Sequence, residues 1–162
     1  MDYSVDNFCA HIDVERTKDI YRSFVADSGD NSAVVNFRKN IFMRKRNIEE
    51  YLSPIGIDIS KYQGLDLVSI NQATQSVTYC GYYPLYVENL TELKDIVGAE
   101  HDDGAFHVNR TDFGFEFSLE YLNDQIVLFF WAELPWLIMP PIEKPKYENK
   151  AVLPEIMREC AL

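Results

Sequence analysis

The side chains best suited to bind a metal ion lie in one short stretch of the sequence. Within seven positions the stretch contains His101, Asp102, Asp103 and His107. Imidazole nitrogens and carboxylate oxygens are ligands for divalent metals. However, Gly104 interrupts the run, no cysteine is near it, and its spacing matches no metal-site motif. We therefore expect a flexible acidic loop and predict neither a metal nor a cofactor. A small cytosolic enzyme or ligand-binding domain with a cleft beside His101 and His107 stays open as the alternative.

Covalent and acid–base catalysis find little support elsewhere in the sequence. Cys9, near an expected N-terminal helix, and Cys80, on an expected strand, belong to no motif that pairs a cysteine with a histidine. Glu116 and Glu120 could act as paired carboxylates, but four strand steps separate them by about 13 Å. This exceeds the separations of about 5 to 9.5 Å found in glycosidases. Because nucleotide-binding and zinc-protease motifs are also absent, we predict that the protein is not an enzyme.

Acidic side chains dominate the charge of the protein. The chain has 162 residues, with 15 Lys and Arg against 26 Asp and Glu, and a net charge of −11 at pH 7. Ten of the acids and two of the bases lie between Glu88 and Asp124, in less than a quarter of the chain. This balance disfavours a nucleic-acid partner and favours a cationic protein. We expect the segment to form a binding surface for a basic partner. The alternative is a solvated strand face that keeps a sheet edge from aggregating.

Two other segments could form contact surfaces. Trp136 lies in an apolar run next to the acidic segment, and aromatic anchors beside charged groups are typical of protein interfaces. The alternative is that this run wraps the core. Five basic residues lie between Arg38 and Arg46. Nucleic-acid contact is one interpretation, but the rest of the chain would repel phosphate. We therefore expect the solvated side of a helix, with pairing to Glu49 and Glu50.

Hydrophobic spacing predicts helices in the first third of the chain. Apolar residues recur with helical period over 13–27 and again from Ser32 to Leu52, with Ser32 as the expected N-cap. A further short helix is expected over 89–97, where Gly98 supplies a C-terminal stop.

The second half of the sequence has the pattern of strands. Segments 65–70 and 75–83 are rich in β-branched and aromatic residues and predict a β-hairpin. Over 113–121, apolar and polar residues alternate strictly, which indicates a strand with one wet face. A turn at 123–124 leads to the apolar strand 126–131, which we place at the centre of the sheet.

The order of these elements predicts an α+β fold. We expect one globular domain over 1–162, with N-terminal helices packed on a mostly antiparallel β-sheet and one inserted short helix. Prolines break up the chain after Glu133, so a Pro-rich C-terminal tail is expected, closed by a short helix over 153–162.

The sequence carries no sign of export or membrane insertion. Its first residues lack the basic and apolar regions of a secretory signal, and no run approaches the roughly 18 apolar residues of a membrane span. Cys9, Cys80 and Cys160 are widely spaced and odd in number, which favours reduced thiols. We therefore predict a cytoplasmic protein without membrane contact.

In size, acidity, aromatic content and lack of catalytic motifs, the whole chain resembles the immunity proteins of bacterial toxin systems. These include contact-dependent growth inhibition and related polymorphic toxin systems. The resemblance implies an inhibitor that binds and neutralises a basic toxin, most suitably a nuclease domain, whose basic surface an acidic protein can occupy. The residues expected at that interface are Asp102, Asp103, Asp112, Glu116, Glu120, Asp124 and Trp136.

Overall fold

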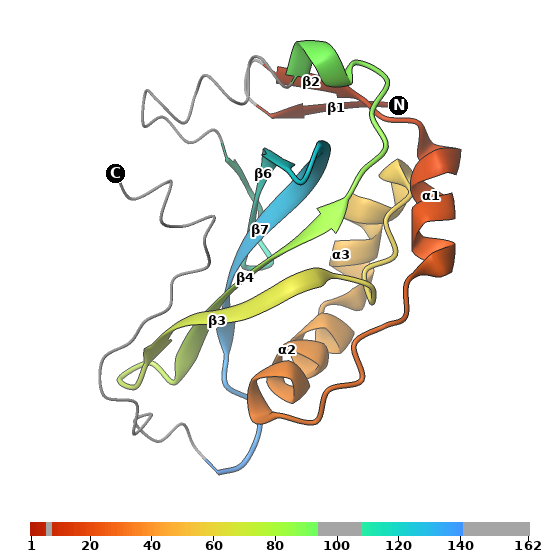
Figure 1. The fold of residues 1–162 in the computed structure, drawn as a ribbon. Helices are drawn as coiled ribbons and strands as arrows, with labels where there is room; N and C mark the ends of the chain where they lie inside the picture. Colours follow the sequence, from red (N-terminus) through yellow and green to blue (C-terminus); the bar gives the residue numbers. More distant parts are fainter. Residues whose placement is uncertain (6–7, 94–107, 141–162) are drawn as a thin grey trace.

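An antiparallel β-sheet is the largest element of the fold, as seen in a computed structural model that describes residues 1–5, 8–93 and 108–140 (Figure 1). Its strands are β3 (Gln63–Asn71), β4 (Ser76–Pro84), β5 (Asn109–Arg110), β6 (Phe115–Leu122) and β7 (Gln125–Pro135). Within the described ranges they are ordered β3-β4-β7-β6-β5, and every neighbouring pair is antiparallel. The fold is α+β, and the predicted hairpin and the central position of the apolar strand are confirmed.

Short polar turns connect the long strands, and their residues explain the geometry. Asn123 and Asp124 join β6 to β7 with positive φ angles of 50° and 62°. Asn and Asp tolerate this left-handed conformation, and two such residues make the turn whose twist matches that of paired strands. Between β3 and β4, the Asn71 carboxamide oxygen accepts the backbone N–H groups of Ala73 and Thr74. Both predicted turns are confirmed.

The N-terminus forms a second, two-stranded sheet that we did not predict from the sequence. Strand β1 (Asp2–Val5) pairs antiparallel with β2 (Phe8–His11), so Cys9 lies in a strand. Tyr3 and Ala10 occupy paired positions and are both buried. Strands of four residues are too short to show a hydrophobic period, and their pairing depends on contacts with the rest of the protein.

The described N-terminal half contains three α-helices, α1 (Val14–Ser23), α2 (Ser32–Met43) and α3 (Lys45–Leu52), followed by the 3-10 turn Ser53–Ile55. The carboxamide oxygen of Asn31 caps α2 by accepting the N–H of Val34 at 3.0 Å, so the predicted cap, Ser32, is the first helical residue instead. α1 ends before the predicted Asp27, because Phe24 is extended and packs its ring edge-on against Tyr21.

The long helix predicted from Ser32 to Leu52 is interrupted at Arg44. The backbone of Arg44 has φ −105° and ψ 10°, outside the helical range, and separates α2 from α3. The interruption allows each helix to place an aromatic ring on a different part of the sheet. Phe37 of α2 stacks on Phe130 of β7, with ring centroids 5.6 Å apart, and Tyr51 of α3 stacks on Phe117 of β6 at 5.1 Å. Figure 1 shows both helices beside the sheet.

One face of the sheet supplies most of the aromatic core. Phe37 also makes ring contacts with Tyr62, Tyr79 and Phe115, and all of these side chains are buried. Aromatic pairs of this kind contribute about 0.5–1.5 kcal/mol each beyond the burial of their area. The rings therefore fix α2 against the centre of the sheet.

The opposite face of β6 is less exposed to solvent than its alternating sequence predicts. Glu116 and Glu120 are half-buried, but Ser118 between them is buried, with an exposed fraction of 7%. Ser118 lies directly opposite Phe129 of β7, itself only 8% exposed. The alternation correctly predicts which face of the sheet each residue lies on, and the apolar side chains of β7 account for the burial of Ser118.

Parts of the prediction concern residues outside the described ranges. The expected short helix begins at 90, and its described part ends at 93, whereas Gly98 and the whole Pro-rich tail after 140 are not described. In the described ranges, none of the helices combines the length and the apolar character that crossing a bilayer requires.

Candidate functional site

The sheet face turned away from Phe37 carries a row of chemically mixed side chains. Residues that pair across antiparallel strands lie on the same face of a sheet. The strand registers therefore form a row in the order Asp66, Cys80, Trp131, Glu116 and Arg110. Glu133, two residues after Trp131 in β7, lies on this face as well and pairs with Thr78 of β4.

A groove of about 370 Å³ lies along this row, and its lining includes Trp131, Glu116, Glu133 and Arg110. Arg110 Nε lies 3.0 Å from an oxygen of Glu116, so one of the two carboxylates already has a cationic neighbour. The exposed Glu133 accepts a hydrogen bond from the Ser76 hydroxyl at 3.1 Å. An indole ring that lines a groove together with two carboxylates can bind a Lys or Arg side chain, because the ring face and both acids attract a cation.

Four acids of the expected binding surface lie in the described ranges, along β6 and in the turns on either side of it. Glu116 and Glu120 share a face of β6, whereas Asp112 lies in the turn before the strand and Asp124 in the turn after it. Glu120 accepts a hydrogen bond from Ser118, and Asp124 accepts one from Tyr121. These acids are therefore spread along the full length of β6 rather than gathered at one point.

Four residues singled out in the sequence lie outside the described ranges. They are His101, Asp102, Asp103 and His107. The alternative of a cleft beside the two histidines concerns the same undescribed segment.

Trp136 has the environment of a core-packing residue. Its ring is half-buried against the hydrophobic core, its indole N–H donates to the Pro140 carbonyl at 3.0 Å, and its backbone N–H donates to Gln75. These contacts favour the alternative that this segment wraps the core. The tryptophan that faces the acids is Trp131. Counting the alternation back from the turn at Asn123 places Trp131 opposite Glu116, so the hairpin register was the signal for it.

The environment of Cys80 makes it a poor nucleophile. Burial raises the pKa of its thiol to about 11, and the carboxylate of Asp66 in the neighbouring strand adds to the effect. The thiolate, which is the nucleophilic form, is therefore scarce at neutral pH.

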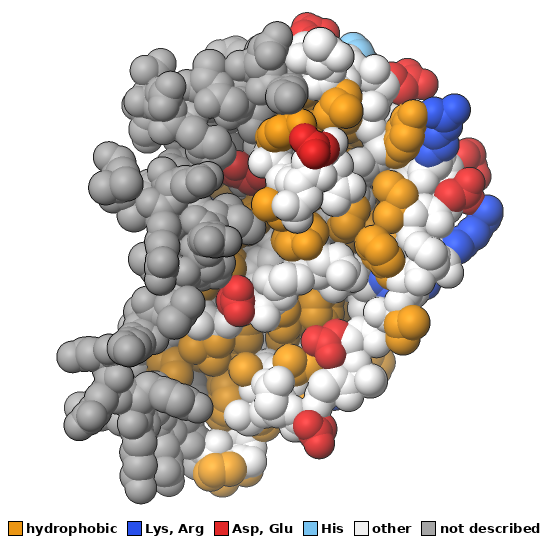
Figure 2. All heavy atoms as spheres, in the orientation of Figure 1, with side chains coloured by type: hydrophobic (Ala, Val, Ile, Leu, Met, Phe, Trp, Pro, Cys, Tyr) orange, Lys and Arg blue, Asp and Glu red, His pale blue; other side chains and the backbone are white. Residues whose placement is uncertain are grey.

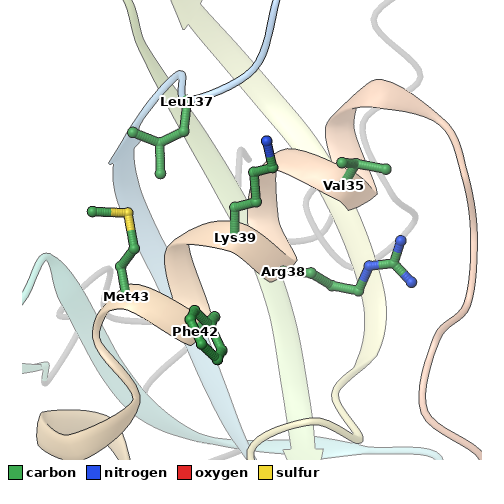
Figure 3. Close-up of a pocket in the computed structure, with 6 residues that line it drawn as sticks. All are labelled: Val35, Arg38, Lys39, Phe42, Met43 and Leu137. Atoms are coloured by element: carbon green, nitrogen blue, oxygen red, sulfur yellow. The ribbon is translucent and has the colours of Figure 1, made fainter.

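A second groove, of about 550 Å³, lies on the outer side of α2 (Figure 3). Phe42 and Met43 line it although they are 79% and 69% exposed, and Leu137 from the segment after β7 faces them. Arg38 and Lys39 supply two cations at the same groove. Exposed apolar side chains that lie together often mark a contact surface, whereas single exposed apolar residues are common on any protein.

The basic run from Arg38 to Arg46 is partly neutralised within its own helices. Lys45 pairs with Glu49 at 3.5 Å and Arg46 with Glu50 at 2.9 Å, which confirms the expected pairing for these two residues. Arg38 donates to the Asp27 carbonyl, and Arg44 donates to the Asn40 side chain, both of which are neutral acceptors. The positive charge of the run therefore concentrates at its α2 end, beside the groove.

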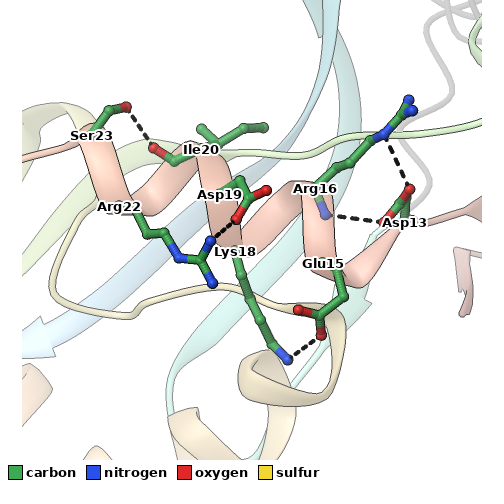
Figure 4. Close-up of polar contacts among 8 residues, drawn as sticks. All are labelled: Asp13, Glu15, Arg16, Lys18, Asp19, Ile20, Arg22 and Ser23. Carbon is green, nitrogen blue, oxygen red and sulfur yellow. Dashed lines mark hydrogen bonds and ion pairs between the residues drawn. The ribbon is translucent and has the colours of Figure 1, made fainter.

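The exposed side of α1 contributes little to the acidic surface. Three pairs with i,i+3 spacing run along it, Asp13 with Arg16, Glu15 with Lys18, and Asp19 with Arg22 (Figure 4). Acidic and basic side chains are correspondingly mixed at the right edge of Figure 2. Exposed pairs of this kind contribute about 0–1 kcal/mol each to stability. Their main effect is to cancel local charge.

The fold is α+β, and the part of the chain that the structure describes carries two grooves, one lined by two carboxylates and Arg110 and one bordered by two cations. Comparison with protein-family models, curated proteins and solved structures finds no match to this chain.

Proposed function

We propose that this protein is a non-catalytic inhibitor of the immunity-protein type, which binds a basic protein in the cytoplasm through the groove beside Trp131. The basic partner that best fits the proposal is a toxin nuclease domain. The observation that carries the proposal is that Trp131, its cross-strand neighbour Glu116 and Glu133 two residues further along β7 line the same groove. In this proposal α2 and α3 cover one sheet face and leave the groove to the partner.

The groove fits a single basic side chain from the partner. Its volume of about 370 Å³ corresponds to about a dozen water molecules at roughly 30 Å³ each. A Lys or Arg that displaces this water gains a cation–π contact with Trp131 of about 0.5–2 kcal/mol. It also gains the electrostatic attraction of Glu133 and of Glu116, whose carboxylate then interacts with both Arg110 and the partner's cation.

The overall charge of the protein supports the same partner. A net charge of −11 accelerates the encounter with a cationic protein, and salt weakens this steering. A nuclease presents a basic surface because it binds phosphate groups. An acidic protein that covers that surface blocks the substrate without any chemistry of its own.

The test compares two double variants of equal net charge. The variant Glu116→Gln with Glu133→Gln removes both carboxylates of the groove, and the control Glu15→Gln with Glu50→Gln removes two exposed acids of the helices. Each tagged protein is passed through host lysate at low and high salt, and the retained proteins are identified by mass spectrometry. We expect a basic protein that wild type and control retain at low salt and that the groove variant loses. Equal retention by both variants would contradict the proposal.

A second contact is favoured by the exposure of Phe42 and Met43. We propose that the α2 groove binds an apolar, acidic segment of a partner protein, because Arg38 and Lys39 border its apolar lining. The variant Phe42→Ser is expected to weaken that contact. The control is Asn47→Ser, an exposed position of α3 outside the groove. If both variants retain the same partners in equal amounts, this second contact does not exist.

A further inference from the structure

Three potential metal ligands of different chemistry converge on the β1–β2 hairpin. Asp2 of β1 pairs directly with His11 of β2, and Cys9 precedes His11 by two residues, so all three side chains lie on one face. A carboxylate oxygen, the thiol sulfur and an imidazole nitrogen lie within 4.8 Å of one another. His11 Nδ1 and an oxygen of Asp2 are 2.7 Å apart and share a hydrogen bond.

These separations are close to those of a tetrahedral zinc site. Zinc bonds of about 2.0–2.3 Å at tetrahedral angles place neighbouring ligand atoms about 3.4–3.6 Å apart. The three atoms of the hairpin need shifts of about 1 Å to reach this arrangement. The side chains of Asp2 and His11 are 67% and 49% exposed and have room to adjust.

The Asn89 side chain fixes the backbone that carries two of the ligands. The Asn89 carboxamide oxygen accepts the N–H of His11 at 2.9 Å, and its NH₂ group donates to the Cys9 carbonyl at 2.9 Å. On the other strand, Asn109 donates to the carbonyl of Ser4 at 3.0 Å. The hairpin is thus held to the rest of the protein by two carboxamides, which preorganises the ligand face.

We propose that Asp2, Cys9 and His11 form a Zn²⁺ site with a fourth position open to water. The combination of sulfur, nitrogen and oxygen ligands suits zinc, whereas Mg²⁺ and Ca²⁺ prefer oxygen ligands alone. Binding releases the Cys9 thiol proton to solvent, and it replaces the hydrogen bond between the His11 imidazole and the Asp2 carboxylate with a bond from each side chain to the metal. Asn89 is a positioning residue for this site. The inference is independent of the proposed protein partner.

The test uses Co²⁺ as a spectroscopic substitute for Zn²⁺. Wild type is expected to develop a thiolate-to-cobalt charge-transfer band in the near ultraviolet, which added Zn²⁺ removes. The variant Cys9→Ser is expected to lack the band, whereas the control Cys80→Ala with Cys160→Ser keeps it. His11→Ala and Asp2→Asn are each expected to weaken Co²⁺ binding at least tenfold. Absence of the band in wild type, or its persistence in Cys9→Ser, would overturn the proposal.

Two further measurements keep the inference testable if a variant fails to fold. In wild type, Zn²⁺ is expected to protect Cys9 from iodoacetamide, as mapped by peptide mass, and unchanged labelling would overturn the site. Removal of a residue that holds metal ligands in position typically weakens metal binding about 10–100-fold. The variant Asn89→Ala, provided that its circular dichroism matches wild type, is therefore expected to bind Co²⁺ about 10–100-fold more weakly than wild type. Undiminished affinity would refute the positioning role of Asn89.

Discussion

Asn36 connects α2 to the end of β7, and its removal gives the sharpest test of how this fold is held together. The residue is fully buried. Its NH₂ group donates to the Tyr79 hydroxyl at 3.0 Å and to the Pro135 carbonyl at 3.2 Å, while its oxygen accepts the N–H of Leu137 at 2.6 Å. The change Asn36→Ala removes all three hydrogen bonds and leaves the Leu137 N–H without this acceptor.

The expected loss follows from these contacts. At about 0.5–1.5 kcal/mol per hydrogen bond, Asn36→Ala should reduce the free energy of unfolding by about 3 kcal/mol. For a chain of this length, this corresponds to a fall in Tm of about 6–12 °C. The measurement is urea unfolding followed by circular dichroism, with an unchanged slope and a lower midpoint.

The control and a second variant separate this mechanism from a general effect of losing an asparagine. Asn47→Ala, at an exposed position of α3, is expected to change stability by less than about 0.5 kcal/mol. Tyr79→Phe removes one partner of Asn36, so its effect and that of Asn36→Ala should be non-additive in the double variant. A loss below about 1 kcal/mol in Asn36→Ala, or full additivity with Tyr79→Phe, would refute the reasoning.

Three other perturbations test separate parts of the fold. Although partial burial opposes it, hydrogen bonding from Ser60 holds the pKa of Asp58 below its usual 3.8. The ionised Asp58 carboxylate therefore stabilises the folded protein above about pH 3.8, and this stabilisation is lost as the pH falls and the carboxylate is protonated. The difference in urea midpoint between wild type and Asp58→Asn should accordingly close towards pH 3, and a difference that stays constant would contradict this. The raised pKa of Cys80, about 11 against the ordinary 9.0, predicts alkylation about 100-fold slower at pH 8 in native than in unfolded protein, and equal rates would contradict it. Gly81→Ala places a methyl group 2.7 Å from a ring carbon of Phe130 and should cost about 1–3 kcal/mol in urea unfolding, whereas an unchanged midpoint would show that the core has room.

The parts of the fold that could be predicted from sequence depend on residues close together in the chain. The turn at Asn123 and Asp124 and the alternation that precedes it fix the β6–β7 hairpin, because the turn sets the register and the alternation sets the faces. The interruption at Arg44 was not predictable in this way. It depends on where Phe37 and Tyr51 meet a sheet that is formed much later in the sequence.

The same distinction explains what was missed at the candidate sites. The acidic segment was visible as a composition, but the pairing of Glu116 with Arg110 depends on the register of β5 against β6. The juxtaposition of Asp2 with Cys9 and His11 depends on a hairpin of four-residue strands, whose sequence has no period to recognise. Composition therefore indicated the sign of the surface, and strand pairing determined which side chains meet.

The placement of the tryptophans gives the protein a built-in optical reporter. The chain has two tryptophans, and Trp131 and Trp136 lie in and directly after the last part of β7. Indole emission therefore reads the polarity of this one end of the sheet, and a cation entering the groove should quench the contribution of Trp131. Opening of the β1–β2 hairpin or of α1 leaves both indoles in place, so unfolding that starts there would be silent in fluorescence and visible first in circular dichroism.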